Sequence, residues 1–281
     1  MLRVRDVGVG LVILACLGGT ACAPGPRGSC PAPRGPTSDL SGQVPDGLML
    51  AANHGRQVLR ADGFFAFPPG VRRVWVDVGA HYLEASRRVV DWEDDVGVIA
   101  VEPLSECWPK WPARERLIGL PVAIDRERGW ADFHVNASDA TSSILKSRSD
   151  SRAAALTRTV EVRRVPVIRL EDVLSRVPAE LEITYLKVDV QGLELRVLQS
   201  AGDGLRRAYA VRTEILESGV YEDDDLGRIP ASHEIEGLLT GLGFRFVRDL
   251  EVHEGRRDRE FVNAGCWGFW GRLQHRRRYG Y

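Results

Sequence analysis

Residues 74–86, VWVDVGAHYLEAS, read as a buried strand that reaches Asp77 and Gly79 and then turns into a helix. Many nucleotide-binding loops of α/β folds begin in this way. A loop that binds a dinucleotide would also carry glycine at positions 81 and 84, where this chain has His81 and Glu84. The loop therefore argues against a pyrophosphate cofactor, because Glu84 would stand where a phosphate must lie.

The whole chain has the composition of a globular protein, with 281 residues of which 44% are hydrophobic and 27% are charged. Its formal net charge of -1 provides no overall positive field that would attract nucleic acid. No two of the five cysteines have C-x-x-C spacing, so we expect no metal site. The sequence leaves open whether Cys107 and Cys266 pair with each other.

The chain divides into four parts by composition. We expect a signal peptide or membrane anchor in residues 1–22, a linker rich in Pro and Gly in 23–47, the main domain in 48–272 and a basic tail in 273–281. The apolar run at 7–22 is shorter than the ~20 residues that a spanning helix needs. This leader indicates secretion, export or membrane attachment, and it leaves open whether the segment is cleaved, lipidated or retained.

Short apolar runs alternate with helix-like segments from residue 71 onward, which is typical of a mostly parallel sheet covered by helices. The runs at 74–78, 96–101 and 183–190 are almost continuously apolar, as in strands buried on both faces. Further elements are expected as follows: a helix at 83–92 facing inward through Ala85, Val89 and Trp92, strands at 116–125, 129–135 and 208–215, a Ser-rich surface loop at 138–152, and a short strand with a helical turn at 165–177.

The C-terminal part predicts one helix and two closing strands. Ser232 is a candidate cap, Gly243 a candidate end, and the helix would bury Ile235, Leu238, Leu239 and Leu242. We expect strands at 244–252 and 261–270, joined by a charged turn into an antiparallel hairpin at one side of the sheet.

Two acids follow the first two strands. Glu102 ends the second strand in VIAVEP, 25 positions after Asp77, close to the ~20 at which a carboxylate meets ribose hydroxyls in a β-α-β unit. Such charge-assisted hydrogen bonds contribute roughly 1.5 to 3 kcal/mol each. S-adenosylmethionine, which has a ribose and a sulfonium cation but no phosphate, suits this loop. The alternative is that both acids are ordinary loop residues at strand ends.

A second group of ionisable residues lies in YLKVDVQGLELRVLQSAG, residues 185–202. Lys187 and Asp189 stand within an otherwise apolar strand, and Glu214 ends the next strand in RTEI. Charges are costly to bury without a partner or a task, so these residues are candidates for a site. A purely structural pair of Lys187 and Asp189 remains the alternative.

Five segments, VDVGAH, VIAVEP, VPVIRLEDVL, LKVDVQGLELRVL and TEI, resemble in order and spacing the FkbM-type methyltransferases, over roughly residues 71–262. The resemblance implies a Rossmann-like class I methyltransferase fold, with a mostly parallel seven-stranded sheet and a C-terminal antiparallel hairpin. It also implies an S-adenosylmethionine-dependent enzyme that methylates a hydroxyl on a sugar, a glycan or a small natural product.

The resemblance assigns the cofactor-binding residues position by position. Asp77, Gly79 and His81 would line the methionine end of the cofactor, Glu102 would bind the ribose, and Asp125 would lie near the adenine.

The same resemblance places Asp189 and Glu214 toward the substrate. Asp189 is the first candidate for the base that accepts the hydroxyl proton, Glu214 is the second, and Lys187 would orient Asp189. His81 and His134 are weaker candidates, because a lone histidine is more often structural.

Three positions depart from the family pattern. His81 replaces the usual Asn, Leu83 replaces the usual Gly, and Gln191 stands where Glu is common. The Leu83 side chain would crowd a backbone that passes close to the cofactor. A rival hypothesis is therefore a non-catalytic exported or membrane-anchored protein that retains the fold. A third hypothesis is a nucleotide-dependent oxidoreductase, and the missing glycines argue against it.

Overall fold

The computed structural model describes residues 35–36, 40, 42–216, 219–222, 229–253 and 256–265. The predicted leader, most of the linker, the basic tail and Cys266 lie outside these ranges, so the predictions on them are untested. Among the described residues, no helix is long and apolar enough to cross a membrane. Leu40 and Val44, which composition assigns to the linker, are buried in the core of the body.

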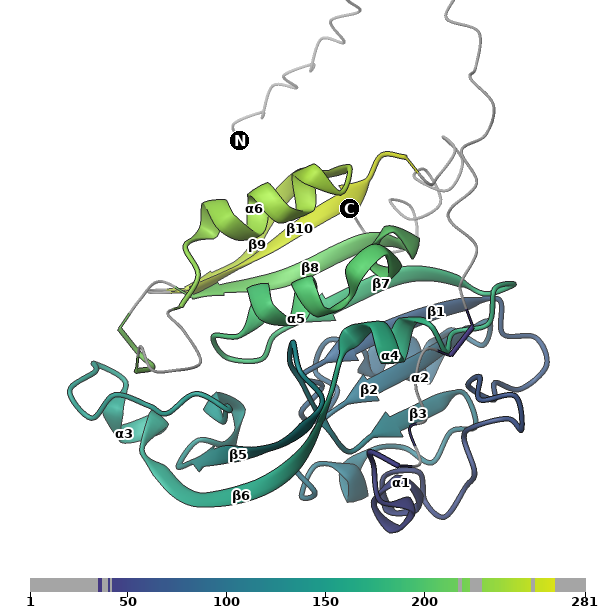
Figure 1. The fold of residues 1–281 in the computed structure, drawn as a ribbon, viewed down its shortest axis with the longest axis horizontal. Coiled ribbons are helices and arrows are strands. Elements are labelled where there is room, and N and C mark those ends of the chain that lie inside the picture. Colours follow the sequence, from purple (N-terminus) through teal and green to yellow (C-terminus); the bar gives the residue numbers. More distant parts are fainter. Residues whose placement is uncertain are drawn as a thin grey trace, which may run out of the picture.

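A main sheet forms the centre of the molecule, with its strands in the order β3-β2-β1-β7-β8-β10-β9 (Figure 1). All neighbouring pairs are parallel except those of β10, which runs against both β8 and β9. This is the predicted seven-stranded sheet with its C-terminal hairpin. The strands are β1 (Arg73–Val78), β2 (Val96–Val101), β3 (Leu117–Leu120), β7 (Glu182–Val188), β8 (Ala208–Leu216), β9 (Phe244–His253) and β10 (Arg256–Asn263).

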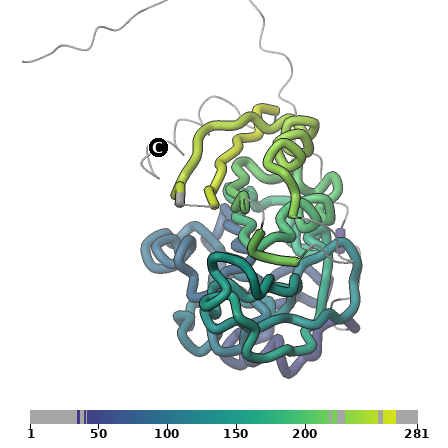
Figure 2. Tube along the Cα trace, turned by 90° about the vertical axis from the view of Figure 1, so that its left-hand side faces the viewer, coloured from purple at the N-terminus to yellow at the C-terminus, as the bar shows by residue number. Residues whose placement is uncertain are grey.

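A smaller sheet has the order β4-β6-β5, with β4 (Ala123–Ile124), β5 (Gly129–Asn136) and β6 (Thr159–Ile168). The added strand predicted at 129–135 is confirmed as β5. The predicted strand at 116–125 is instead divided: β3 pairs with β2 in the main sheet, while β4 pairs with β6. Pro121 follows β3 directly and has no amide hydrogen with which to continue the ladder. Figure 2 shows the hairpin and the small sheet at opposite ends of the body.

Helices cover both faces of the main sheet (Figure 1). One core lies under α4 (Leu170–Leu174), α5 (Glu194–Ser200) and α6 (Ser232–Gly241), and the other lies under α2 (Arg87–Trp92) and the turn η1 (Trp108–Lys110). The near-continuous burial of β1, β2 and β7 confirms the prediction of strands enclosed on both faces. The remaining short elements are α1 (Asp46–Ala52), η2 (Asp139–Thr141), α3 (Ala154–Thr157) and η3 (Gly202–Arg207).

The first predicted helix is shorter than expected, and its inward face is different. It begins at Arg87, because His81 and Leu83 adopt positive φ angles of 44° and 68° that no α-helix contains. Val89 and Val90 are buried, whereas Trp92 is 80% exposed. The prediction that Trp92 faces the core was wrong, because the buried stripe runs through Ser86, Val89 and Val90, and position 92 lies off this face.

Two details at the C-terminal end also differ from the prediction. Ser232 lies inside α6, and the residue before the helix is Ala231, whose N–H is bonded to the Glu234 carboxylate at 2.9 Å. Gly243 does end this region, with φ at +92°. The last strand starts at Arg256, so the charged segment predicted as a turn is largely strand, where its charges form cross-strand ion pairs.

The loops that follow β1 and β7 approach each other closely at Gly79. Gly79 has φ at +72°, and an added Cβ atom would lie 1.7 Å from the carbonyl oxygen of Asp189. Neighbouring strands β1 and β7 place the two loops side by side, so any side chain here would push them apart.

Gly79→Ala should therefore lower the free energy of unfolding by more than the cost of positive φ alone. Gly55→Ala is the matched control, because Gly55 has φ at +80° and nothing within 4 Å of an added Cβ. We expect about 1 to 2 kcal/mol for the control and about 1 to 3 kcal/mol beyond that for Gly79→Ala. Urea unfolding measures both, and equal losses in the two variants would contradict the close approach.

Candidate active site

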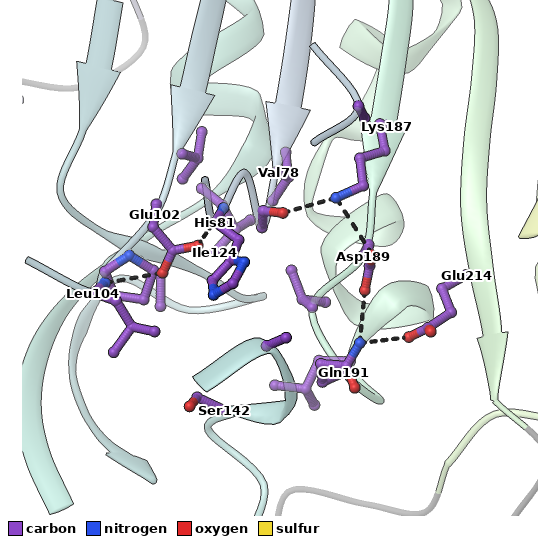
Figure 3. Close-up of a pocket in the computed structure, with 18 of the residues that line it drawn as sticks. Val78, His81, Glu102, Leu104, Ile124, Ser142, Lys187, Asp189, Gln191 and Glu214 are labelled. Carbon is purple, nitrogen blue, oxygen red and sulfur yellow. Dashed lines mark hydrogen bonds and ion pairs between the residues drawn. The ribbon is translucent and has the colours of Figure 1, made fainter. Parts of the chain in front are cut away.

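A cavity of about 410 Å³ opens at the carboxyl ends of the central strands (Figure 3). Its walls come from the loops after β1, β2 and β7, from β8 and β10, and from η2. In a doubly wound sheet this edge is where ligands bind. Of the predicted site residues, the cavity is lined by Gly79, His81, Glu102, Lys187, Asp189 and Glu214.

Lys187 carries a buried positive charge between β1 and β7. Its ammonium donates to the Gly79 carbonyl oxygen at 2.7 Å and lies 3.4 Å from oxygens of both Asp77 and Asp189. Burial lowers the pKa of Lys187, but the two carboxylates raise it by more, so the net shift is upward. The upward shift favours the charged form of Lys187, and the short distance to Asp189 is consistent with the predicted orienting role, which stays a prediction.

Glu102 directly follows β2 and faces the cavity, and backbone amides donate to both of its carboxylate oxygens. The amide of His81 donates to one oxygen at 2.8 Å, and the amide of Leu104 donates to the other at 2.9 Å. Burial raises the pKa of Glu102 to about 7, against the lowering effect of these two hydrogen bonds. Each oxygen retains a lone pair for a ligand hydroxyl.

His81 lies between two acids from different segments. Its Nδ1 is 2.8 Å from Glu84 Oε1, its Nε2 is 3.2 Å from Asp139 Oδ1, and the Tyr82 hydroxyl also bonds Asp139 at 2.7 Å. Burial lowers the pKa of His81, but the surrounding carboxylates of Glu84, Asp139 and Glu102 outweigh it, so the net shift is upward. The imidazole thus joins the β1 loop to η2 across the cavity edge.

Asp189 and Glu214 face each other on the opposite side, with Gln191 between them (Figure 3). Gln191 Nε2 donates to Asp189 Oδ1 at 2.8 Å and to Glu214 Oε2 at 2.9 Å. Burial opposes ionisation of Asp189, yet Lys187 and the hydrogen-bond donors keep its pKa below the usual range. Burial and the nearby Asp189 charge raise the pKa of Glu214 well above its usual value. The two shifts run in opposite directions, so they favour the ionised form of Asp189 and the protonated form of Glu214.

Glu194 completes this acidic group, because carboxyl oxygens of Asp189, Glu194 and Glu214 all lie within 4.8 Å of one another. Its own oxygens accept from the amides of Val190 and Gly192, at 3.0 to 3.1 Å. The three carboxyls thus receive hydrogen bonds from backbone amides and the Gln191 side-chain amide, and the Lys187 ammonium lies beside Asp189.

Two predicted cofactor residues do not line the cavity. Asp77 lies beneath the loop, where Ser86 Oγ donates to it at 2.7 Å and Lys187 balances its charge. Asp125 receives two hydrogen bonds from the Arg196 guanidinium, both at 2.7 Å. Asp125 is thus occupied by a side chain of α5, and a contact with adenine is not supported.

Leu83 does not crowd the cavity. Its side chain is fully buried in the core under α2, and its backbone adopts the positive φ for which the family pattern uses Gly. The expected conflict with a cofactor is therefore wrong, because the side chain points into the protein.

Several lining residues were not recognised from the sequence. Residues 138–152 were predicted to be a surface loop, but Ser142, Ser143, Ile144 and Leu145 are buried. Ser143 Oγ donates to the Gln191 carbonyl oxygen at 2.9 Å, which draws this segment against the β7 loop. Arg212 and Arg256 line the far side. Arg212 lies within β8, two positions before Glu214, which could have indicated it, whereas Arg256 at the start of β10 has no local signal.

Comparison with known families gives a match to the methyltransferase FkbM domain over residues 77–246. The chain belongs to the FkbM methyltransferase family. This confirms the resemblance drawn from the sequence, and the strand order given above is that of the class I methyltransferase fold. A search of curated proteins finds no match.

Solved structures similar to this FkbM protein include two methyltransferases. An O-methyltransferase family 2 protein from Planctomyces limnophilus in complex with apigenin is 11% identical, with 76% of this chain and 53% of that chain covered and a TM-score of 0.36. A variant of a 16S rRNA adenine N1 methyltransferase from Catenulisporales acidiphilia is 15% identical, with coverages of 78% and 90% and a TM-score of 0.37.

Glu102→Gln should remove a pH-dependent loss of stability. The folded-state pKa of about 7 lies above the unfolded value, so ionisation destabilises the parent as pH rises from about 4.5 to 7. Between pH 5 and pH 8, we expect the free energy of unfolding of the variant to rise by about 2 to 3 kcal/mol relative to that of the parent. Urea unfolding at both pH values measures this, and a pH-independent difference would show that Glu102 titrates normally.

Proposed function

We propose that this FkbM methyltransferase transfers a methyl group from S-adenosylmethionine to a hydroxyl of a sugar, a glycan or a small natural product. The observation that carries the proposal is the position of Glu102 and Asp189 on opposite sides of one cavity. Glu102 would offer two fixed carboxylate oxygens to ribose hydroxyls, and Asp189 would act as an ionised base.

The residues present fit the cofactor. Glu102 offers free lone pairs, Leu104 and Ile124 provide apolar surface for a nucleoside base, and Glu84 and Asp139 favour a cationic group. Glu84 on the β1 loop would repel a pyrophosphate. S-Adenosylmethionine supplies an electrophilic methyl group on a cationic sulfur and needs no phosphate site.

Asp189 is the residue suited to accept the hydroxyl proton. Its side chain is 28% exposed, lines the cavity and stays ionised beside Lys187. A hydroxyl placed within hydrogen-bond distance of Asp189 would lose its proton to the carboxylate as the new O–CH3 bond forms. Alignment of donor and acceptor within the cavity would supply most of the rate enhancement.

The far side of the cavity suits a polyhydroxy acceptor. Arg212 and Arg256 provide donors, and Asp258 and Glu251 provide acceptors, around the space next to Asp189. Hydroxyl groups both donate and accept, so they match such a mixed surface. The carboxylates on the loop side disfavour the phosphate backbone of a nucleic acid.

Glu102→Ala should weaken binding of S-adenosylhomocysteine by about 10-fold or more, because it removes charge-assisted hydrogen bonds. Asp125→Ala is the matched control: Asp125 lies outside the cavity, so its loss should leave affinity unchanged. Isothermal titration of the full chain measures both. Absence of binding by the folded parent would favour the non-catalytic reading, and equal affinities for parent and Glu102→Ala would reject the ribose assignment.

Asp189→Asn should leave S-adenosylhomocysteine affinity within about 3-fold of the parent and reduce methyl transfer by about 100-fold or more, as expected for loss of a general base. Transfer can be followed with a radiolabelled methyl donor and a panel of monosaccharides and polyols. If any acceptor of the parent is methylated equally fast by the variant, Asp189 is not the base.

A further inference from the structure

Gln191 occupies the centre of the acidic side of the cavity. Its backbone has φ at +59°, and its amide nitrogen donates one hydrogen to Asp189 and one to Glu214. The single hydroxyl hydrogen of Tyr221 is shared between two acceptors, Gln191 Oε1 at 3.1 Å and the Thr141 carbonyl oxygen at 2.7 Å. Both side chains are buried, so the amide is held in one orientation with its NH2 toward the carboxyls.

We propose that Gln191, oriented by Tyr221, is a positioning residue that holds the Asp189 and Glu214 carboxyls together and supports ionisation of Asp189 beside Lys187. The proposal deepens the proposed function and rests on it for its catalytic meaning. The distribution of protons between Asp189 and Glu214 can be measured without a substrate, so it can be tested separately from the proposed function.

The local charges explain why a neutral donor is needed at this position. Three carboxyls are crowded together, and like charges at such distances cannot all ionise at neutral pH. An amide gives each of Asp189 and Glu214 a hydrogen bond without adding charge, whereas the glutamate common in the family would add a fourth carboxyl. The groups that face this pair from the surrounding elements are Asp77, Lys187, Glu194, Tyr221, Arg256 and Asp258.

The two carboxyls are not equivalent, and this asymmetry decides which one ionises. Asp189 lies 3.4 Å from the Lys187 ammonium, while Glu214 is deeper and its nearest guanidinium, Arg256, is 3.7 Å away and half exposed. The pKa of Asp189 is accordingly lowered and that of Glu214 is raised. Gln191 donates to both carboxyls at nearly equal distances, so it stabilises a carboxylate in this pair, and the Lys187 ammonium favours Asp189 as the one that ionises.

The proton balance of the reaction follows from this arrangement. The hydroxyl proton would pass to the Asp189 carboxylate as the acceptor oxygen gains the methyl group and the bond from carbon to sulfur breaks. Glu214 keeps its proton throughout. Asp189, the more exposed of the two, can then release its proton to water through the mouth of the cavity.

The first test needs no substrate. Carboxyl groups of the full chain are labelled with ¹³C and titrated by NMR in the parent, in Gln191→Glu and in Gln191→Asn, whose shorter amide tolerates positive φ. We expect the pKa of Asp189 to rise by about one unit or more in both variants, through added charge in one and a lost hydrogen bond in the other. An unchanged Asp189 titration in the folded variants would overturn the proposal.

Tyr221→Phe tests the orienting role, with Tyr185→Phe as the matched control. Both changes remove a buried phenol hydroxyl, but that of Tyr185 contacts Glu260, at 3.2 Å, instead of Gln191. Tyr221→Phe should raise the pKa of Asp189 in the same direction by a smaller amount, and Tyr185→Phe should leave it unchanged. Equal effects of the two variants would contradict the role of Tyr221.

The second test measures methyl transfer as a function of pH. Activity should appear as pH rises through the pKa of Asp189, so Gln191→Glu should move the acidic limb of kcat/KM upward by about one unit. An unmoved limb, with transfer still measurable, would overturn the role of Gln191. If the NMR shift occurs but the parent transfers no methyl group, the proposed function fails and the proton distribution stands.

Discussion

The buried ammonium of Lys187 is the constraint from which the arrangement of the site follows. A lone cation at this depth would cost several kcal/mol, and it is retained because three oxygens surround it. These oxygens belong to Gly79, Asp77 and Asp189, which lie at the ends of the two central strands. One charge thus holds the two loops together, and Gly79 allows the close approach that this requires.

Asp77 and Asp189 share this cation but have different surroundings. Asp77 is turned into the protein, where Ser86 and Lys187 satisfy it, so its contribution is to the shape of the loop. Asp189 is turned toward the cavity and is left with an oxygen that a ligand can reach. A motif match alone assigns both acids to the ligand, whereas the direction of each side chain assigns only one.

The sequence predicted what depends on local pattern and failed where distant contacts decide. Apolar runs identified the central strands, and their ends located Glu102 and Asp189 correctly at the cavity. No local signal indicated that Arg196, 71 positions away, would occupy Asp125. The Ser-rich segment looked exposed because its hydroxyls are polar, yet Ser143 is buried by its bond to the β7 loop. Its partner lies 48 positions away, and hydrophobicity does not encode such a contact.

The loops around the site hold backbone strain at three positions that are not glycine. His81, Leu83 and Gln191 all adopt positive φ, and two of them line the cavity. Each costs about 1 to 2 kcal/mol that glycine would avoid, and such strain persists only where the surroundings fix it. Leu83 is fixed by the core, His81 by Glu84 and Asp139, and Gln191 by Tyr221 and two carboxyls. His81 connects the first loop to η2, and Gln191 bonds both carboxyls of the acid pair. Two of the three departures from the family pattern therefore belong to the site, whereas Leu83 belongs to the core.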